Sequence, residues 1–358
     1  MSIPPVRDDI VGLAAYGAPQ LDVPVRLNVN ENPFPPSATL VKAIAEDVAQ
    51  VAQQLNRYPD RDAVALRHDL ADYIMRESGG VITSENVWVG NGSNEVMHHL
   101  LAAFGGPGRS LVTFAPTYSM YEEYCRETFT HFSIVFRDEN YAVTKAAIDE
   151  ALALEPHIVV VCSPNNPTGT VLAPDVLDYL VERFNGLIIV DEAYGEFRSQ
   201  GTASSIAKYA GHSKVVITRT MSKAFSCAGL RLGYAIAHPE VVKACTIVRL
   251  PYHLSAVTQA VARAALRHAD ELLSQVALLR DERDALAAWL KEHDYSVLPS
   301  GANFLLFGTF ADRHQIWQGL LDHGVLVRET GPTGWLRVSI GTPEENQAFR
   351  SALISVDK

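Results

Sequence analysis

The sequence has few cysteines, no excess of positive charge and no long apolar run. The four cysteines, Cys125, Cys162, Cys227 and Cys245, form no CxxC pair, which argues against a disulfide framework or a zinc site and suits a reducing compartment. We expect free thiols in the packed interior. The net charge of −11 opposes a nucleic-acid-binding surface, because such surfaces need clustered basic side chains.

No apolar run approaches the ~20 residues needed to cross a bilayer. The opening MSIPPVRDDIVG lacks the basic and apolar regions of a secretory signal. We therefore expect a cytoplasmic protein that binds neither membrane nor nucleic acid. His98 and His99 are adjacent, so on a helix their side chains diverge, and no metal site is predicted.

A chain of 358 residues with 47% hydrophobic content exceeds what one compact core usually carries, so we expect two domains. Residues 27–37 read as an irregular, turn-rich segment. From residue 38 onward, helical patterns alternate with short apolar strands. Helices are predicted at ATLVKAIAEDVAQVAQQL and EVMHHLLAAF, and strands at NVWVG, SLVTFAP, HIVVVCSP, GLIIVDEAY and KVVITRTMS.

Several of these strands are continuous apolar runs, which indicates burial on both faces. The predicted fold class is therefore α/β, with a mostly parallel central sheet between helix layers and a smaller α+β domain. One helical stretch is expected from about residue 256 to 293, followed by strands at ANFLLFG, GVLVRE and WLRVSIG and a closing helix. We divide the chain into residues 1–28, which pack with the small domain, 29–250, the large domain, and 251–358, the small domain.

Chemistry in open α/β sheets is expected just beyond the carboxyl ends of the strands. GNGSNE at 90–95 follows one strand and opens a helix, which favours phosphate binding by backbone N–H groups. The alternative is that Ser93 or Asn94 only caps that helix. SPNNPTG at 163–169 follows another strand, and Asn166, held before Pro167, would be a rigid donor. The alternative there is a plain turn.

Two further strand ends carry charge. Asp191 ends the run GLIIV, and a buried acid there requires a partner, expected to be cationic. Tyr194 lies three residues farther on. Ser222 and Lys223 follow KVVITRT, with Arg231 after a small-residue turn. Burial and nearby positive charges disfavour the charged form of a lysine, so its amine is more often neutral and can act as a nucleophile and base. The alternative is a lysine that reaches out to solvent.

One ligand accounts for all four strand ends. It carries a phosphate for the glycine-rich turn, an electrophilic carbon for Lys223, a ring nitrogen for Asp191, and a phenolic oxygen for Asn166 and Tyr194. Pyridoxal 5′-phosphate has these groups.

The sequence also resembles the fold-type I pyridoxal-phosphate aminotransferases, and within them the histidinol-phosphate aminotransferase family. The resemblance runs in order through RLNVNENPFPPS, NRYPDRD, GNGSNE, PTYSMY, SPNNPTG, VDEAYGEF, TRTMSKAF, AGLRLGY, RLPYHLS, ANFLLFG, GVLVRE and LRVSIGTPEEN. It therefore covers nearly the whole chain.

The resemblance implies a cofactor role for each matching residue. Lys223 would bond covalently to the cofactor and Asp191 would hold its ring nitrogen. Tyr118 would stack on the ring, and Asn166 and Tyr194 would bind its oxygen. The residues implied at the phosphate are Ser93, Asn94, Ser222, Arg231 and, from the partner subunit of a homodimer, Tyr58.

For the substrate, the resemblance points to Arg337 and Arg328 as anchors of an anionic group. It also implies that Tyr16, Asn166 and, from the partner subunit, Tyr252 contact the substrate. Arg337 alternates with apolar neighbours in LRVSIG, so it faces away from the apolar side of its strand. Without the resemblance it would be taken for an arginine on a solvated sheet face.

The implied reaction is transamination in histidine biosynthesis. L-Histidinol phosphate and 2-oxoglutarate would be interconverted with imidazole-acetol phosphate and L-glutamate. The main alternative is an aromatic amino-acid aminotransferase on the same fold, since no sequence element identifies a residue that reads the imidazole. Two others are a decarboxylase of a phosphorylated amino acid and a non-enzymatic regulator, which would need a basic segment that this chain lacks.

Overall fold

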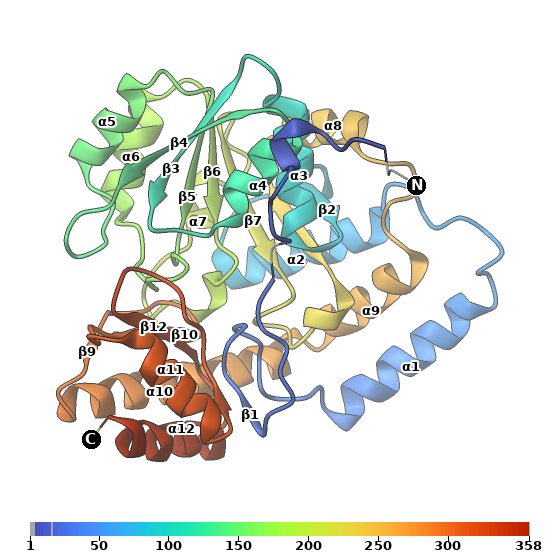
Figure 1. Ribbon diagram of the computed structural model, residues 1–358. Helices are drawn as coiled ribbons and strands as arrows, with labels where there is room; N and C mark the ends of the chain where they lie inside the picture. The colour runs from blue at the N-terminus through green and yellow to red at the C-terminus, as the bar shows by residue number, and fades with distance from the viewer. Residues whose placement is uncertain (1–3, 16, 358) are drawn as a thin grey trace.

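A seven-stranded sheet forms the centre of the computed structural model, which describes residues 4–15 and 17–357 (Figure 1). The strand order is β2-β8-β7-β6-β5-β3-β4. The strands are β2 (Val87–Gly90), β3 (Ser110–Ala115), β4 (His131–Phe136), β5 (Ile158–Cys162), β6 (Leu187–Asp191), β7 (Val215–Thr220) and β8 (Gly233–Ile236). All neighbours pair in parallel except β8, which is antiparallel to both β2 and β7.

The sheet is buried on both faces, as its continuous apolar strands predict. In β5, Val159 and Val161 belong to one apolar core, whereas Ile158, Val160 and Cys162 belong to a second core on the opposite face. The second core includes side chains of α3 (Gly92–Phe104), α4 (Met120–Glu127) and α8 (Pro239–Val248). The first includes side chains of α2 (Val64–Ser78), α5 (Lys145–Ala153), α6 (Pro174–Arg183) and α7 (Ile206–Tyr209).

The predicted large-domain strands and helices are confirmed, and the structure contains further elements that were not predicted. Each of the five predicted strands is present, and the predicted first helix is α1 (Ala38–Ala52). Strands β4 and β8 were not predicted. Strand β4 is an edge strand in which Val135 alone is fully buried, and it lacks a continuous apolar run. The described part of the chain also contains four short 3-10 helices: η1 (Asp8–Ile10), η2 (Ser84–Asn86), η3 (Gly195–Phe197) and η4 (Ala228–Leu230).

The C-terminal part is smaller and mixes strands with helices. Its antiparallel sheet has the order β12-β10-β9, formed by β9 (Ser296–Val297), β10 (Phe304–Gly308) and β12 (Trp335–Ser339). Helices α11 (Arg313–Asp322) and α12 (Pro343–Val356) lie beside it (Figure 1). Strand β1 (Val25–Arg26) pairs in parallel with β11 (Val325–Leu326), so the N-terminal segment joins this part.

The single helical stretch expected over residues 256–293 is wrong in one respect, because it is two helices. Helix α9 (Ala256–Arg267) ends at His268, whose φ of −106° and ψ of 19° leave the helical range, and α10 (Ala269–Glu292) follows. Helix α9 packs along α1 and α2, whereas α10 packs against η3 and the small sheet (Figure 1). The two helices therefore need different axes, which apolar spacing along the chain does not reveal.

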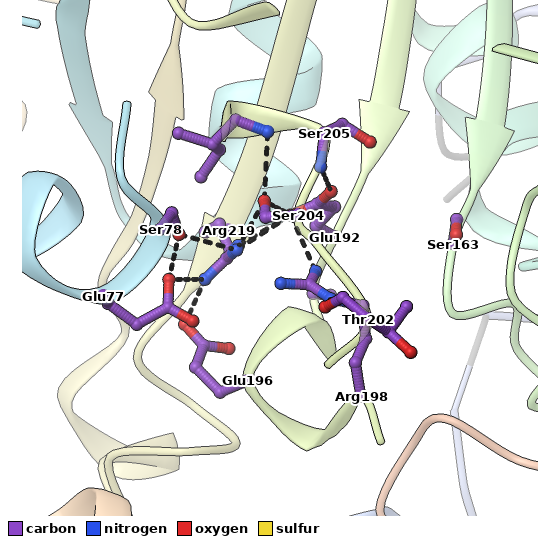
Figure 2. A network of polar contacts seen from close by, with 12 residues as sticks. Glu77, Ser78, Ser163, Glu192, Glu196, Arg198, Thr202, Ser204, Ser205 and Arg219 are labelled. Carbon is purple, nitrogen blue, oxygen red and sulfur yellow. Dashed lines mark hydrogen bonds and ion pairs between the residues drawn. The ribbon is translucent and has the colours of Figure 1, made fainter. Parts of the chain in front are cut away.

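An ion network surrounds Glu192, the residue that follows β6 (Figure 2). Arg219 of β7 is fully buried and contacts carboxylates of Glu77 at 3.1 Å, Glu192 at 2.8 Å and Glu196 at 2.9 Å. Arg198 adds a second cation, 3.1 Å from Glu192. Burial raises the pKa of Glu192, but Arg219 and Arg198 more than offset it and lower that pKa to about 2. This network fixes the loop that follows Asp191.

All four cysteines are free and buried, as predicted. Among the helices that the structure describes, none combines the length and apolar character that crossing a membrane requires.

Candidate functional site

A cavity of about 620 Å³ opens between the large sheet and the C-terminal part. Residues of both parts line it, together with the N-terminal segment Asn28–Glu31. Most of the predicted site residues meet here: Ser93, Asn94, Tyr118, Asn166, Asp191, Tyr194, Ser222, Lys223, Arg231, Arg328 and Arg337.

One end of the cavity is built to receive an anion. Helix α3 begins at Gly92, and its N-cap residue Asn91 makes no side-chain capping bond. Ser93 and Asn94 therefore lie within the first turn, and the interpretation of either as the helix cap is wrong. Gly92 has a φ of +83°, and a Cβ there would lie 2.6 Å from Nη2 of Arg231. Only glycine lets the guanidinium lie against the start of the helix, where backbone N–H groups and helix dipole favour negative charge.

Arg231 is held in place by its own loop. It adopts a left-handed backbone conformation, with a φ of 57°. Its Nη1 donates to the backbone oxygen of Ala228 at 3.2 Å and to Oγ of Ser222 at 3.4 Å. The hydroxyl of Thr220 donates to Oγ of Ser222 at 3.0 Å. Arg231 and Ser222 thus stand together at the anion end, as predicted.

Lys223 lies partly buried along the cavity wall. Its Nζ donates to the backbone oxygen of Val29 at 2.9 Å. Burial, followed by the charge of Arg337, lowers the pKa of this amine to about 8. The negative charge of Glu31 raises this pKa, and the positive charge of Arg231 lowers it. A sizeable fraction of the amine is therefore neutral near physiological pH and able to act as a nucleophile or base.

Asp191 is buried at the end of β6. Its neighbours across the sheet are Cys162 of β5 and Thr218 of β7. Three neutral donors reach its carboxylate: Tyr121 at 2.7 Å, Thr218 at 3.1 Å and the backbone N–H of Ala193 at 3.2 Å. Burial raises its pKa although these hydrogen bonds lower it. The cationic partner expected from the sequence is not found among residues 4–15 and 17–357.

Asn166 and Tyr194 also line the cavity. Arg337 donates from Nη1 to Oδ1 of Asn166 at 2.5 Å, which leaves the amide Nδ2 as the donor. The hydroxyl of Tyr194 accepts from Nδ2 of Asn30 at 3.0 Å. Burial raises the pKa of Tyr194 to about 12, so it remains a protonated donor. Each residue therefore keeps a hydrogen-bond donor, which the role predicted for it requires.

Arg337 and Arg328 lie on adjacent backbone segments. Each residue's N–H donates to the other's carbonyl oxygen at 2.9 Å. Arg337 is buried, and its Nη2 donates to the backbone oxygen of Asn28 at 2.8 Å. Arg328 donates to the backbone oxygen of Gly17 at 3.1 Å. Two guanidinium groups at one cavity wall suit a doubly charged anion.

Two predicted residues, Tyr58 and Tyr252, do not line this chain's own cavity. They stack on each other, with ring centroids 4.4 Å apart. Tyr58 is 80% exposed and Tyr252 40% exposed. A third predicted residue, Tyr16, lies outside the described residues.

The sequence analysis did not predict some of the residues that hold the site in place. Tyr121 and Thr218 hold Asp191, and Asn30 holds Tyr194. Tyr121 lies three positions beyond Tyr118 in PTYSMY, but Tyr118 precedes α4, so helical spacing could not have indicated where Tyr121 points. Thr218 lies inside a buried strand, where a polar side chain itself requires a partner.

A group of possible metal ligands lies outside the cavity, where Glu95, His99 and His253 place one ligand atom each within 4.8 Å of one another. Trp88 donates from Nε1 to Nδ1 of His99 at 3.2 Å, so Nε2 of the neutral ring carries its proton. Glu95 accepts two hydrogen bonds from Asn91. These bonds brace the loop before α3.

The cavity combines an anion site, the Lys223 amine with its lowered pKa, and a buried acid, Asp191, whose described partners are all neutral. A pair of arginines lines the same cavity. The cavity can bind a flat, phosphorylated, cationic ring and hold a second anionic molecule over it.

Comparison with known proteins agrees with this geometry. The family Aminotransferase class I and II matches residues 23–353. Histidinol-phosphate aminotransferase 3 of Burkholderia lata is 52% identical over 353 residues, which cover 98% of this chain and 95% of that protein. Histidinol-phosphate aminotransferase of Thermobifida fusca is 53% identical over 352 residues, 98% of this chain and 95% of that protein.

Two solved structures share the fold. The aspartate aminotransferase from Thermus thermophilus with maleate has a TM-score of 0.79 at 27% identity, over 92% of this chain and 90% of that one. The histidinol-phosphate aminotransferase from Sinorhizobium meliloti in complex with pyridoxal-5′-phosphate has a TM-score of 0.82 at 21% identity, over 93% of this chain and 91% of that one.

Proposed function

The chain belongs to the class I and II aminotransferase family, and from this premise we propose that it is a histidinol-phosphate aminotransferase. It is a pyridoxal-phosphate-dependent transaminase that interconverts L-histidinol phosphate and 2-oxoglutarate with imidazole-acetol phosphate and L-glutamate. The observation that carries the substrate assignment is the pair Arg328 and Arg337 at one wall of the cavity, together with about half-identical relatives of that name.

The residues of the cavity fit pyridoxal phosphate. Asp191 is a buried carboxylate whose described partners are all neutral donors, and a protonated ring nitrogen would supply the missing positive charge. The uncapped start of α3 and the guanidinium packed on Gly92 suit the phosphate. Lys223 has the lowered pKa that covalent attachment to a carbonyl compound requires.

We assign the cofactor contacts as the sequence predicts. Asp191 would hold the ring nitrogen, and Asn166 and Tyr194 would donate to the ring oxygen. Tyr118 would cover one face of the ring. The phosphate would be held by a group of residues at the anion end: Ser93, Asn94, Ser222, Arg231 and the partner subunit's Tyr58.

When bound, pyridoxal phosphate withdraws electrons from the carbon that bears the substrate's amine and so makes its proton removable. Lys223 would hold the cofactor between turnovers. Its Nζ, when free, would be the base that takes the proton from that carbon. The lowered pKa keeps Nζ able to accept this proton near neutral pH.

Arg337 and Arg328 are assigned to the anionic group of the substrate. Arg337 is buried and oriented by Asn166 and Asn28, so it would serve both the phosphate of histidinol phosphate and a carboxylate of glutamate. Arg328 adds a second positive charge, which matches a phosphate better than a carboxylate. Asn166, Tyr16 and the partner subunit's Tyr252 are assigned to the same pocket.

We propose a homodimer with shared active sites. Support comes from exposed apolar side chains beside the stacked pair Tyr58 and Tyr252. Ile247 is 79% exposed and Leu250 76% exposed, and a second copy of the chain would cover them. In this arrangement the two tyrosines, absent from their own cavity, reach that of the partner.

The division into residues 1–28, 29–250 and 251–358 is also a proposal. The pairing of β1 with β11 supports the first unit's place beside the small domain. The cytoplasm is the proposed location, supported by four free, buried thiols.

A spectral experiment tests the function. The purified enzyme is mixed separately with histidinol phosphate, phenylalanine and phosphothreonine while the absorbance of the bound cofactor is followed, with and without 2-oxoglutarate. Histidinol phosphate is expected to convert the cofactor fastest, and 2-oxoglutarate to restore the original spectrum. Conversion by phenylalanine but not by histidinol phosphate would contradict the substrate assignment and favour an aromatic aminotransferase. A Lys223→Ala enzyme that turned over at the wild-type rate would contradict the mechanism.

A further inference from the structure

Tyr121 contacts Asp191, the acid at the end of β6. It belongs to α4, it is 1% exposed, and its hydroxyl donates to Oδ2 of Asp191 at 2.7 Å. Cys162 and Asp191 are neighbours across the parallel pair β5 and β6, so their side chains point to the same face of the sheet. The apolar core on that face includes both Cys162 and Tyr121. Tyr121 therefore reaches the carboxylate from the helix layer, not from the sheet.

The donors around Asp191 are divided between its two oxygens. Thr218 and the N–H of Ala193 both donate to Oδ1. Among the described residues, Tyr121 is the donor to Oδ2. A carboxylate oxygen accepts more than one hydrogen bond, so Oδ2 can receive Tyr121 and also a donor from the cavity that Asp191 lines.

The segment that leads into α4 links this contact to the cavity wall. The rings of Tyr118 and Tyr121 meet edge to face, with centroids 5.7 Å apart, and Tyr118 lines the cavity. The same short segment thus presents one tyrosine to the expected position of the cofactor ring and another to the acid that pairs with that ring. Because Tyr121 is buried and locked by packing, its hydroxyl is a fixed donor.

We propose that Tyr121 is a positioning residue for the cofactor. Its hydroxyl would hold the carboxylate of Asp191 in the rotamer that meets the ring nitrogen. It would also stabilise the negative charge of that carboxylate in the dry interior before the cofactor arrives. The inference rests on the proposed function, since it assumes that Asp191 pairs with the ring nitrogen of pyridoxal phosphate.

The test is a double-mutant cycle on the affinity for pyridoxal phosphate. Cofactor is removed from the wild type and from Tyr121→Phe, Asp191→Asn and the double variant, and the dissociation constant of each is measured by equilibrium titration. Loss of a hydrogen bond to a charged group is expected to weaken binding to Tyr121→Phe by roughly 10-fold or more. In the Asp191→Asn background the same substitution should change affinity far less, because the charge on which Tyr121 acts is gone.

Two further variants separate positioning from structural support. Tyr234 is another buried tyrosine of the large sheet, with no hydrogen-bond partner for its hydroxyl among the described residues, so Tyr234→Phe should leave cofactor affinity unchanged. Thr218→Val removes a donor from the other oxygen of Asp191 and should weaken binding in the same direction as Tyr121→Phe. The absorbance spectrum of the bound cofactor is expected to change in both Tyr121→Phe and Thr218→Val, but not in Tyr234→Phe.

The outcomes distinguish this inference from the proposed function. If the wild type binds the cofactor and Tyr121→Phe binds it equally well with the same spectrum, the role of Tyr121 is wrong and the proposed function stands. Equal losses with Asp191 intact and in the Asp191→Asn background would also overturn it, because they would indicate a general structural effect. If Tyr121→Phe does not fold, Tyr121→Met takes its place in the cycle with Asp191→Asn, because it also removes the donor to Oδ2 of Asp191. If the wild type binds no pyridoxal phosphate, the proposed function itself fails.

Discussion

The amine nitrogen of Lys223 lies 2.9 Å from the backbone oxygen of Val29, to which it donates a hydrogen bond. The flanking residues are also engaged, since Arg337 donates to the oxygen of Asn28 and Asn30 donates to the hydroxyl of Tyr194. Residues 28–30 therefore contact the proposed catalytic lysine, the substrate arginine and the ring-binding tyrosine. This irregular segment completes the site from the side of the small sheet.

The pH dependence of cofactor uptake should follow the amine of Lys223. Its pKa lies at about 8, lowered mainly by burial and then by Arg337 and raised by Glu31. A neutral amine is needed for covalent attachment, so the rate of uptake should increase with pH and level off above that value. Arg337→Met removes a positive charge and should shift the midpoint to higher pH. Glu31→Gln removes a negative charge and should shift it to lower pH.

Stopped-flow absorbance of the cofactor-free enzymes mixed with pyridoxal phosphate measures these midpoints. The cofactor's own titration is common to all three proteins, so the opposite directions of the two shifts are the decisive result. Shifts of the same sign in both variants would show that Lys223 is not the titrating group.

The two arginines should differ in their effect on the two substrates. Arg328→Gln is expected to lower kcat/KM for histidinol phosphate by roughly 10- to 100-fold, with a smaller loss for glutamate. Arg337→Gln should lower both, because this buried arginine is assigned to either anion. Steady-state kinetics with each amino donor gives kcat/KM for histidinol phosphate and for glutamate, and the ratio of the two is compared between variant and wild type. Equal losses for both donors in Arg328→Gln would remove the argument that two arginines select a phosphate.

Arg219 should be essential for stability. Replacing it with methionine leaves the carboxylates of Glu77, Glu192 and Glu196 buried without their shared cation. The expected loss in the free energy of unfolding is about 3–5 kcal/mol, measured by urea denaturation. As a control, Lys208→Met breaks an exposed ion pair with Asp178 and should cost less than about 1 kcal/mol.

The same network should make the free energy of unfolding depend on pH in the acid range. The pKa of Glu192 is lowered to about 2 in the folded protein, below the ordinary value for glutamate of about 4.3. Its stabilising contribution is therefore present above the ordinary pKa and is lost as the pH falls through the folded one. Arg219→Met should make unfolding less dependent on pH over that range. An unchanged acid transition in the variant would contradict this assignment.

Leu250 should belong to the dimer interface. It is 76% exposed in the single chain and lies two residues before Tyr252. Leu250→Glu would place a charge in an apolar interface and should yield folded monomers with little activity. Analytical ultracentrifugation gives the oligomeric state, and circular dichroism checks the fold. Ile354→Glu, a change at a 43% exposed position on α12, is the matched control. A dimeric, active Leu250→Glu enzyme would refute the proposed interface.

Much of the large sheet could be predicted because its strands are continuous apolar runs. Strand β5, IVVVC, is buried at every position, and such a run is recognisable without its neighbours. The edge strand β4 has no such run and was not predicted. Strand β8, GYAI, has a glycine among its four residues and was not predicted either. The break at His268 was missed because both flanking helices have helical spacing, and only their different packing partners separate them.

The sequence by itself determined the chemistry at the strand ends. Lys223, Asp191, Asn166 and Arg231 follow strands or tight turns in a pattern that needs only local structure and the parallel order of strands. Their position just beyond the ends of apolar strands was enough to predict that these side chains share one cavity.

Only the tertiary structure decided how the site is held and tuned. The bond from Tyr121 to Asp191 joins residues 70 positions apart, and that from Arg337 to Asn28 joins residues 309 apart. The pKa of Lys223 depends on burial and on Arg337 and Glu31, which are distant in the chain. Hydrogen bonds and Coulomb interactions act over a few ångströms of space, and sequence spacing does not reveal which distant residues folding brings that close.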